Sequence, residues 1–252
     1  YPSAAGTPEL RRAAAGWLRR RFGVEVDADR QVVPATGAKE AIFHLPLAFA
    51  GGTARRKVVM PDPGYPTYEV GALFAGLEPV KVPLRVERRF LLEPGELPET
   101  LLRETLVLWI SYPHNPTGAV APRDYLERVG RAAREHGFVV ASDECYADVY
   151  FGAPPLSILQ VQVENALAIH SCSKRSGMTG YRSGFVAGDP DLVAQLRRMR
   201  SHPGVASPDF VTAAAVAAWS DDAHAAERRE IFRRKRDRLT RFFQGHGLSC
   251  DG

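Results

Sequence analysis

The sequence predicts an α/β fold in which a mostly parallel sheet carries helices on both faces. Short apolar runs alternate along the chain with longer segments of helical pattern. Few of these runs alternate apolar with polar residues, which is typical of strands covered on both sides. The regular succession of strand and helix favours a doubly wound domain. A chain of 252 residues is long enough for one large core.

Seven segments are expected to form strands: 31–33, 57–60, 79–82, 106–110, 138–141, 166–170 and 183–187. Helices are expected between and after them, over 7–21, 38–50, 67–75, 123–136 and 189–200. From 209 to 243 the pattern is helical, with a break near 220–222. In such folds ligands bind beyond the carboxyl ends of the strands, so residues directly after strands are the first candidates for a site.

The composition is that of an ordinary globular protein, with 45% hydrophobic and 25% charged residues. No apolar run approaches the roughly 20 residues that span a bilayer, and the first residues lack the pattern of a signal peptide. Three cysteines, Cys145, Cys172 and Cys250, give neither a disulfide framework nor a metal-ligand spacing. We therefore expect a cytoplasmic protein with no membrane partner and no metal.

A basic run over 228–238 raises the question of nucleic acid binding. The run contains charges of both signs, and aromatic residues are not interleaved to make a stacking surface. We expect a helix with a solvated charged face, with Ile231, Phe232 and Leu239 turned inward, and no nucleic acid partner.

The segment 171–184, SCSKRSGMTGYRSG, is the strongest chemical signal and directly follows an apolar strand. A lone lysine at such a place is normally a solvated surface residue. Here Lys174 has Ser171 and Ser173 on one side, and glycines and Arg182 on the other. Hydroxyls and a guanidinium suit a phosphate, and an amine beside a phosphate is what an aldehyde-bearing phosphate cofactor needs.

Four further motifs follow strands. Asn115 lies in SYPHNPTG, which is also a turn-forming sequence. Asp143 and Tyr146 lie in DECY, where an acid at a strand end can simply cap a helix. Residues 36–39, TGAK, join a strand to a helix whose first N–H groups can bind phosphate. The segment 63–68, PGYPTY, offers Tyr65 for ring stacking.

Together these motifs resemble those of fold-type I, class I/II aminotransferases, and the resemblance implies pyridoxal 5′-phosphate (PLP) as cofactor. It implies the large domain of that fold, with Lys174 forming the Schiff base and acting as general base. Asp143 is implied to keep the pyridine nitrogen protonated, and Tyr146 to contact the phenolic oxygen. We expect Glu144 and Tyr68 to be structural.

The resemblance also assigns the remaining cofactor contacts. Asn115 shares the phenolic oxygen, and Tyr65 stacks on the ring. Tyr1 is implied to reach across a homodimer interface to the neighbouring phosphate. The phosphate itself is assigned to residues that share a position at strand ends: Gly37, Ala38, Lys39, Ser171, Ser173 and Arg182.

For the substrates, segments 174–176, 184–189 and 218–224 resemble the succinyldiaminopimelate aminotransferase branch of lysine biosynthesis. That resemblance implies glutamate as amino donor and the 2-oxo acid N-succinyl-2-amino-6-oxopimelate as acceptor. The alternatives are an aminotransferase for LL-diaminopimelate, alanine or aromatic substrates, and a PLP-dependent C–S β-lyase. An alternative of another class is a non-catalytic PLP-binding regulatory module.

The resemblance implies a PLP-binding large domain over 1–235. Residues 236–252 are then the end of a connecting helix and the start of a small C-terminal domain. Family members extend further at both ends, so we expect the arginine that binds the substrate α-carboxylate to lie outside this sequence. Arg200 is a candidate for a distal substrate carboxylate of the partner subunit, or else a solvated arginine at a helix end.

Overall fold

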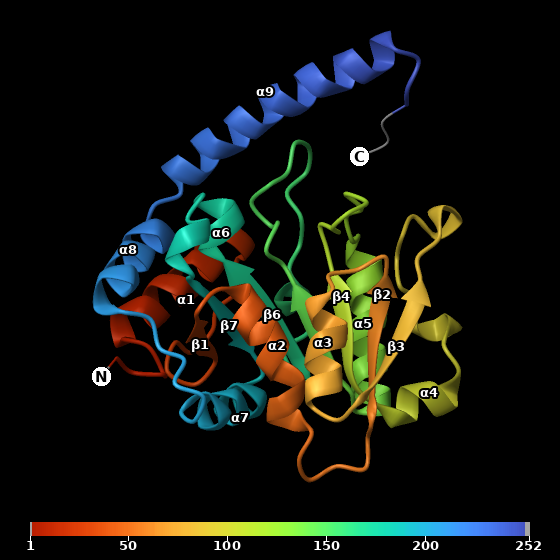
Figure 1. Ribbon diagram of the computed structural model, residues 1–252, viewed down its shortest axis with the longest axis vertical. Coiled ribbons are helices and arrows are strands. Elements are labelled where there is room, and N and C mark those ends of the chain that lie inside the picture. Colours follow the sequence, from red (N-terminus) through yellow and green to blue (C-terminus); the bar gives the residue numbers. More distant parts are fainter. Residues whose placement is uncertain (1, 250–252) are drawn as a thin grey trace.

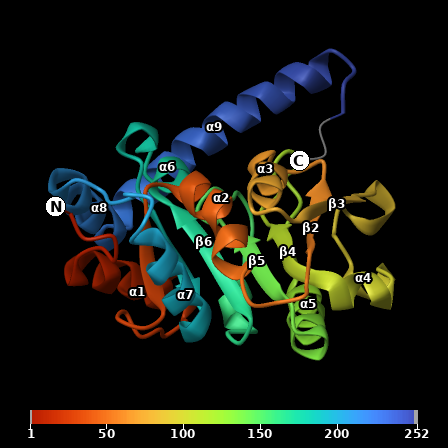
Figure 2. The same ribbon diagram turned by 60° about the horizontal axis from the view of Figure 1, so that its bottom comes forward.

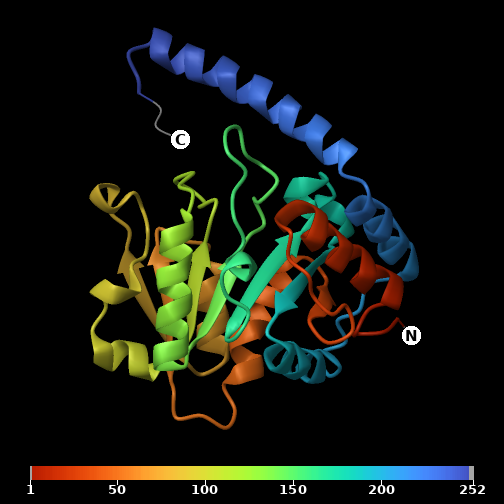
Figure 3. The same ribbon diagram turned by 180° about the vertical axis from the view of Figure 1, so that it is seen from behind.

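The computed structural model describes residues 2–249 and consists of one seven-stranded sheet between two layers of helices (Figures 1 and 3). The strands are β1 (Val32–Ala35), β2 (Lys57–Asp62), β3 (Glu78–Pro83), β4 (Thr105–Ser111), β5 (Val139–Asp143), β6 (Ala166–Ser171) and β7 (Gly184–Gly188). The helices are α1 (Pro8–Phe22), α2 (Ala38–Phe49), α3 (Thr67–Phe74), α4 (Glu99–Glu104), α5 (Arg123–His136), α6 (Cys172–Arg175), α7 (Pro190–Arg200), α8 (Asp209–Ser220) and α9 (Ala223–Gly245). The predicted fold class is confirmed.

The sheet has the order β1-β7-β6-β5-β4-β2-β3. Only β7 runs antiparallel to its neighbours, β1 and β6, and the other pairs are parallel. The carboxyl ends of β2, β4, β5 and β6 therefore meet at one edge. The register sets Asp143 at the end of β5 beside Ser111 of β4 and Ile169 of β6. This edge holds the candidate site.

Successive residues of the central strands pack into two different cores. Leu108, Ile110 and Val140 belong to the core under α1, α5 and α8, whereas Val107 and Trp109 belong to the core under α2, α3 and α7. Both cores are apolar because each face of the sheet is covered by helices, as Figures 1 and 3 show from opposite sides. This arrangement explains why the strand sequences are apolar at nearly every position.

Local signals determine where the outer helices begin and end. The Thr7 hydroxyl accepts a hydrogen bond from Leu10 N at the start of α1, and Pro8 occupies its first turn. Gly23 ends this helix with φ 66°, and Gly137 ends α5 with φ 69°, both in the left-handed region. These features explain why the predicted bounds of the two helices differ little from the observed ones.

The C-terminal part of the chain is helical as expected, with α8 and α9 divided at Asp221 and Asp222. In Figures 1 and 2, α9 extends away from the sheet. Ile231 and Phe232 are half-buried, but Leu239 is 55% exposed. The expectation that Leu239 turns inward is wrong, because this part of α9 has left the body of the domain. The division at residue 235 falls within α9 and stays a prediction.

Among residues 2–249, no helix combines the length and hydrophobicity needed to cross a membrane. In the same described residues, no group of three or more His, Cys, Asp or Glu side chains is arranged to hold a metal ion.

Candidate cofactor-binding site

A hollow of about 430 Å³ opens at the carboxyl ends of the central strands. Ten of the residues predicted from the sequence line it: Ala38, Lys39, Tyr65, Asn115, Asp143, Tyr146, Ser171, Ser173, Lys174 and Arg182. Four unpredicted residues complete the wall: Ile42, Ser111, Cys145 and Thr179. The sheet order brings these segments together although they are spread over more than 140 positions of the chain.

Lys174 projects from α6, a single turn that directly follows β6. The Ser171 hydroxyl caps this turn by accepting a hydrogen bond from Ser173 N at 3.1 Å. The Lys174 ammonium lies 5.6 Å from the centre of the Tyr146 ring. The side chain is exposed to solvent, so its amine is accessible to a ligand in the hollow.

Asp143 forms the floor of the hollow and is 8% exposed. Its Oδ2 accepts a hydrogen bond from the Tyr68 hydroxyl at 2.8 Å, and its Oδ1 accepts one from Cys145 N at 3.2 Å. Burial and the nearby Asp143 charge raise the pKa of Tyr68 well above its ordinary value, so the phenol stays a donor. The carboxylate is therefore held in one orientation by two donors.

Tyr68 was expected to be structural, and its contact with Asp143 was not predicted. It is buried in the first turn of α3, where its ring stacks on Trp109 with centroids 4.6 Å apart. Tyr68 and Asp143 are 75 positions apart, and no local pattern connects them. The only available signal was that both residues lie at the carboxyl ends of parallel strands, β2 and β5, which end at the same edge of the sheet.

The opposite end of the hollow has donors suited to a phosphate. Helix α2 begins at Ala38 after Gly37, which has φ 79° and provides no side-chain cap. The first N–H groups of α2 therefore point out of the helix with the positive end of its dipole. A Cβ at Gly37 would collide with the Arg182 guanidinium, so the glycine allows this arginine to approach the helix.

Arg200 lies behind this phosphate end of the hollow. It is 4% exposed and pairs with Glu40 in the first turn of α2. Burial opposes ionisation of Glu40, but Arg200 and His44 outweigh it and lower the pKa of Glu40. The expectation of a solvated arginine is wrong, because the guanidinium is buried and paired, and the contact with a substrate carboxylate of the partner subunit stays a prediction. The ionised Glu40 also accepts a hydrogen bond from Thr36 N at 3.0 Å, which fixes the turn before Gly37.

Glu144 lies behind the site in a buried cluster. Its Oε1 accepts hydrogen bonds from Ser142 Oγ and Ile158 N, both at 2.9 Å, and its Oε2 lies 3.4 Å from His170 Nε2. Burial raises the pKa of Glu144 to about 7 and lowers the pKa of His170 to about 3. These contacts are consistent with the structural role expected for Glu144.

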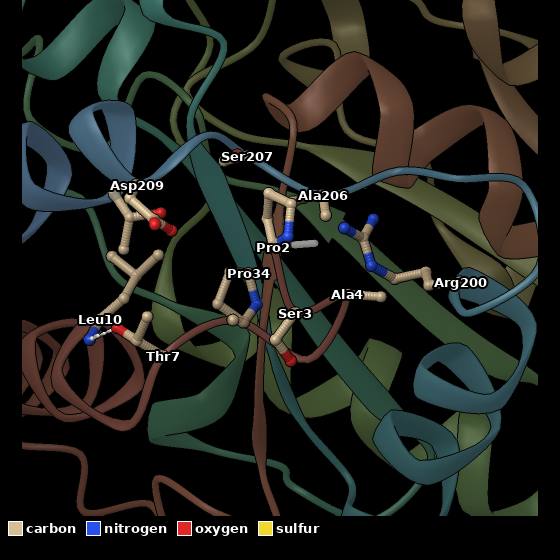
Figure 4. A pocket seen from close by; sticks show the side chains of 13 residues that line it. Pro2, Ser3, Ala4, Thr7, Leu10, Pro34, Arg200, Ala206, Ser207 and Asp209 are labelled. Atoms are coloured by element: carbon tan, nitrogen blue, oxygen red, sulfur yellow. Dashed lines mark hydrogen bonds between the residues drawn. The ribbon is translucent and has the colours of Figure 1, made fainter.

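Tyr1 lies outside the described residues, so its predicted contact with a neighbouring subunit stays a prediction. The segment that follows it lies against Pro34, Ala206 and the Arg200 side chain (Figure 4). Its first described residue, Pro2, is exposed.

The described residues of the hollow fit PLP in their chemistry. An amine and an acid, Lys174 and Asp143, line the same space. Arg182 and the start of α2 provide positive charge and N–H donors for a phosphate. Tyr65 and Lys39 also line the hollow, with the Lys39 ammonium 5.8 Å from the centre of the Tyr65 ring.

Comparisons with known proteins agree with this site. Residues 1–251 match the family described as aminotransferase class I and II. The chain is 36% identical over 252 residues to an LL-diaminopimelate aminotransferase of Aquifex aeolicus, covering 98% of this chain and 65% of that protein. It is 40% identical to a 4-dedimethylamino-4-oxo-anhydrotetracycline transaminase of Streptomyces rimosus, covering 100% of this chain and 67% of that protein.

Among solved structures, an aminotransferase of Neisseria meningitidis superimposes with a TM-score of 0.91 at 34% identity, covering 97% of this chain and 64% of that one. The chain thus spans slightly less than two thirds of the Aquifex relative and of this structure. The match over nearly every residue, at this identity and with this superposition, leaves one conclusion: the chain belongs to the class I and II aminotransferase family, whose members use PLP.

Proposed function

We propose that this protein is a PLP-dependent aminotransferase that moves an amino group between an amino acid and a 2-oxo acid. The observation that carries the proposal is the shared hollow. The amine of Lys174 and the carboxylate of Asp143 line one space, and Arg182 and the N-terminus of α2 lie at its other end. Family membership supports the same activity.

PLP, when bound, supplies an aldehyde for attachment to an amine and an electron-withdrawing ring. Arg182, Ser173 and the first N–H groups of α2 would hold its phosphate. Asp143 would keep the ring nitrogen protonated, since an opposite charge nearby favours the charged form. Tyr68 holds that carboxylate from behind.

Three side chains that line the hollow would act on the substrate or on the cofactor. Nζ of Lys174, once free, takes the proton from the α-carbon of the amino substrate as general base. Asn115 and Tyr146 also line the hollow, where each would offer a donor to an oxygen of the cofactor. Because Lys174 is exposed, exclusion of water requires a further covering segment or subunit. We assign that role to a homodimer partner and to a small domain beyond residue 235.

For the substrate we favour a diaminopimelate-type amino acid. The Aquifex relative is named for LL-diaminopimelate, which was one of the alternatives considered from the sequence. The N-succinylated 2-oxo acid of the main sequence interpretation contains the same pimelate chain and stays in the proposal as the competing acceptor. The Streptomyces transaminase is named for 4-dedimethylamino-4-oxo-anhydrotetracycline, so relatives of similar identity are named for very different substrates.

The test is a transamination assay of the full-length protein loaded with PLP. The amino donors tested with 2-oxoglutarate are LL-diaminopimelate, its N-succinyl derivative, alanine and phenylalanine. Glutamate is tested as donor with pyruvate as acceptor. Lys174→Ala is expected to abolish turnover and the visible absorbance of the attached cofactor. Lys235→Ala, on the exposed face of α9, is the matched control and should retain both.

Transamination by Lys174→Ala at the wild-type rate would refute the proposal. Release of pyruvate and ammonia from a cysteine conjugate, without amino transfer, would favour the C–S β-lyase. PLP binding without any turnover would favour a regulatory module.

A further inference from the structure

Arg175, the residue after Lys174, is unusually placed for an arginine. It is 3% exposed, and its guanidinium lies beside two indole rings that pack against each other, 5.6 Å from the centre of Trp17 and 5.3 Å from that of Trp219. Since α6 is only four residues long, it has little stability of its own. The orientation of Lys174 must therefore depend on what its neighbours in this turn contact.

The Arg175 guanidinium binds the junction between α8 and α9. It donates to Ala218 O at 2.6 Å and to Asp221 O at 2.9 Å, and it pairs with Asp222 Oδ1 at 2.7 Å. His224 of α9 adds a second connection, because its Nε2 lies 2.9 Å from Ser176 Oγ. The turn that carries Lys174 is thus attached directly to the first residues of α9.

The same guanidinium contacts the segment that carries Tyr146. Arg175 Nε lies 2.8 Å from Asp148 Oδ2, and Arg21 Nε donates to the other oxygen of that carboxylate at 2.8 Å. The Asp148 side chain is 5% exposed, so this pair is little screened by solvent. One buried side chain therefore joins the turn of Lys174, the loop after Tyr146 and the start of α9.

We propose that Arg175 is a positioning residue that holds the Lys174 amine in place beside the Tyr146 ring. The position of the amine then depends on the direction in which α9 leaves the domain. The contacts of Arg175 with Asp221 and Asp222 connect the α8–α9 junction to the turn of Lys174, and its contact with Asp148 connects that turn to the segment of Tyr146. This inference rests on the proposed function, in that Lys174 must be the amine that bonds to PLP.

The test compares two ligands of the same hollow. PLP has an aldehyde that bonds to Lys174, whereas pyridoxamine 5′-phosphate has an amine in its place and cannot form that bond. Dissociation constants of both are measured on apo-protein of wild type, Arg175→Met, Arg175→Lys and Asp222→Asn. Asp237→Asn is the control, since Asp237 pairs only with Arg233 and Arg236 of α9 among the described residues.

In Arg175→Met the ratio of the PLP to the pyridoxamine phosphate dissociation constant should rise about tenfold, because a misplaced amine weakens only the bond to the aldehyde. Arg175→Lys should not restore the wild-type ratio, since an ammonium lacks the planar guanidinium fork that reaches three acceptors. Asp222→Asn should raise the ratio by a smaller factor, and Asp237→Asn should leave it unchanged.

A wild-type ratio in Arg175→Met, or an equal loss of affinity for both ligands, would overturn the inference and leave Arg175 a residue of the fold alone. If Arg175→Met does not fold, Asp222→Asn decides, because the Asp222 side chain is half-exposed and its substitution changes only the ion pairs with Arg175 and Arg20. Lys174→Ala separates the two proposals. If it still binds PLP with wild-type absorbance, the proposed function fails; if it loses the absorbance while Arg175→Met has the wild-type ratio, only the positioning role fails.

Discussion

The Tyr68→Phe substitution tests, in protein without cofactor, whether the Tyr68 hydroxyl holds the Asp143 carboxylate. The substitution removes one hydroxyl and leaves the ring stacked on Trp109. The substitution thereby removes the 2.8 Å hydrogen bond that Tyr68 donates to the Asp143 carboxylate, and Asp143 is 8% exposed. A buried hydrogen bond to a charged group contributes about 1.5–3 kcal/mol, whereas one between neutral groups contributes about 0.5–1.5 kcal/mol.

Tyr125→Phe is the matched control. Tyr125 is also fully buried, but its hydroxyl donates to a neutral acceptor, Leu92 O, at 3.0 Å. We expect Tyr68→Phe to lower the free energy of unfolding by about 1 kcal/mol more than Tyr125→Phe. In a domain of this size 1 kcal/mol corresponds to about 2–4 °C in Tm.

The measurement is urea unfolding of apo-protein at pH 7, followed by circular dichroism, with thermal unfolding as a second readout. If Tyr68→Phe costs no more than Tyr125→Phe, Asp143 is not an ionised acceptor held by Tyr68, and the reasoning about the floor of the site is wrong. If the slope of the urea transition is the same in both variants, the comparison reports on the folded state.

Two further predictions concern residues beside the site. Burial raises the pKa of Glu144 to about 7, so this residue stabilises the fold below its ordinary pKa near 4.5 and loses that contribution as pH rises through 7. The Glu144→Gln variant stays neutral at this position. Its free energy of unfolding, relative to that of wild type, should therefore rise by up to about 3 kcal/mol between pH 4.5 and pH 8. Urea unfolding at both pH values measures this difference, and a difference that does not change with pH would contradict the prediction. Gly37→Ala places a methyl group against Arg182 at a residue with φ 79°. It should lower the free energy of unfolding by about 1–3 kcal/mol and weaken PLP binding. Gly51→Ala is its control, because a Cβ there has no neighbour within 4 Å, and equal unfolding curves for the two variants would refute the steric argument.

The fold class and most residues that line the hollow could be predicted from the sequence alone. Apolar runs alternating with helical segments predict parallel strands, and parallel strands place their carboxyl ends at one edge. Motifs that directly follow strands, such as those of Asp143 and Lys174, were therefore expected to meet, and they do. The roles of these residues came from the family resemblance, since a strand end alone does not distinguish a cofactor ligand from a helix cap.

The distant side chains that support the site could be identified only from the three-dimensional structure. Tyr68 reaches Asp143 because α3 packs over β4, and Arg200 reaches Glu40 because α7 and α2 share one face of the sheet. Leu239 is exposed because α9 leaves the domain, although its spacing suits a buried face. Periodicity specifies which face of a helix is apolar but not which helix lies opposite. That choice follows from strand order and packing, which are set by contacts between residues far apart in the chain.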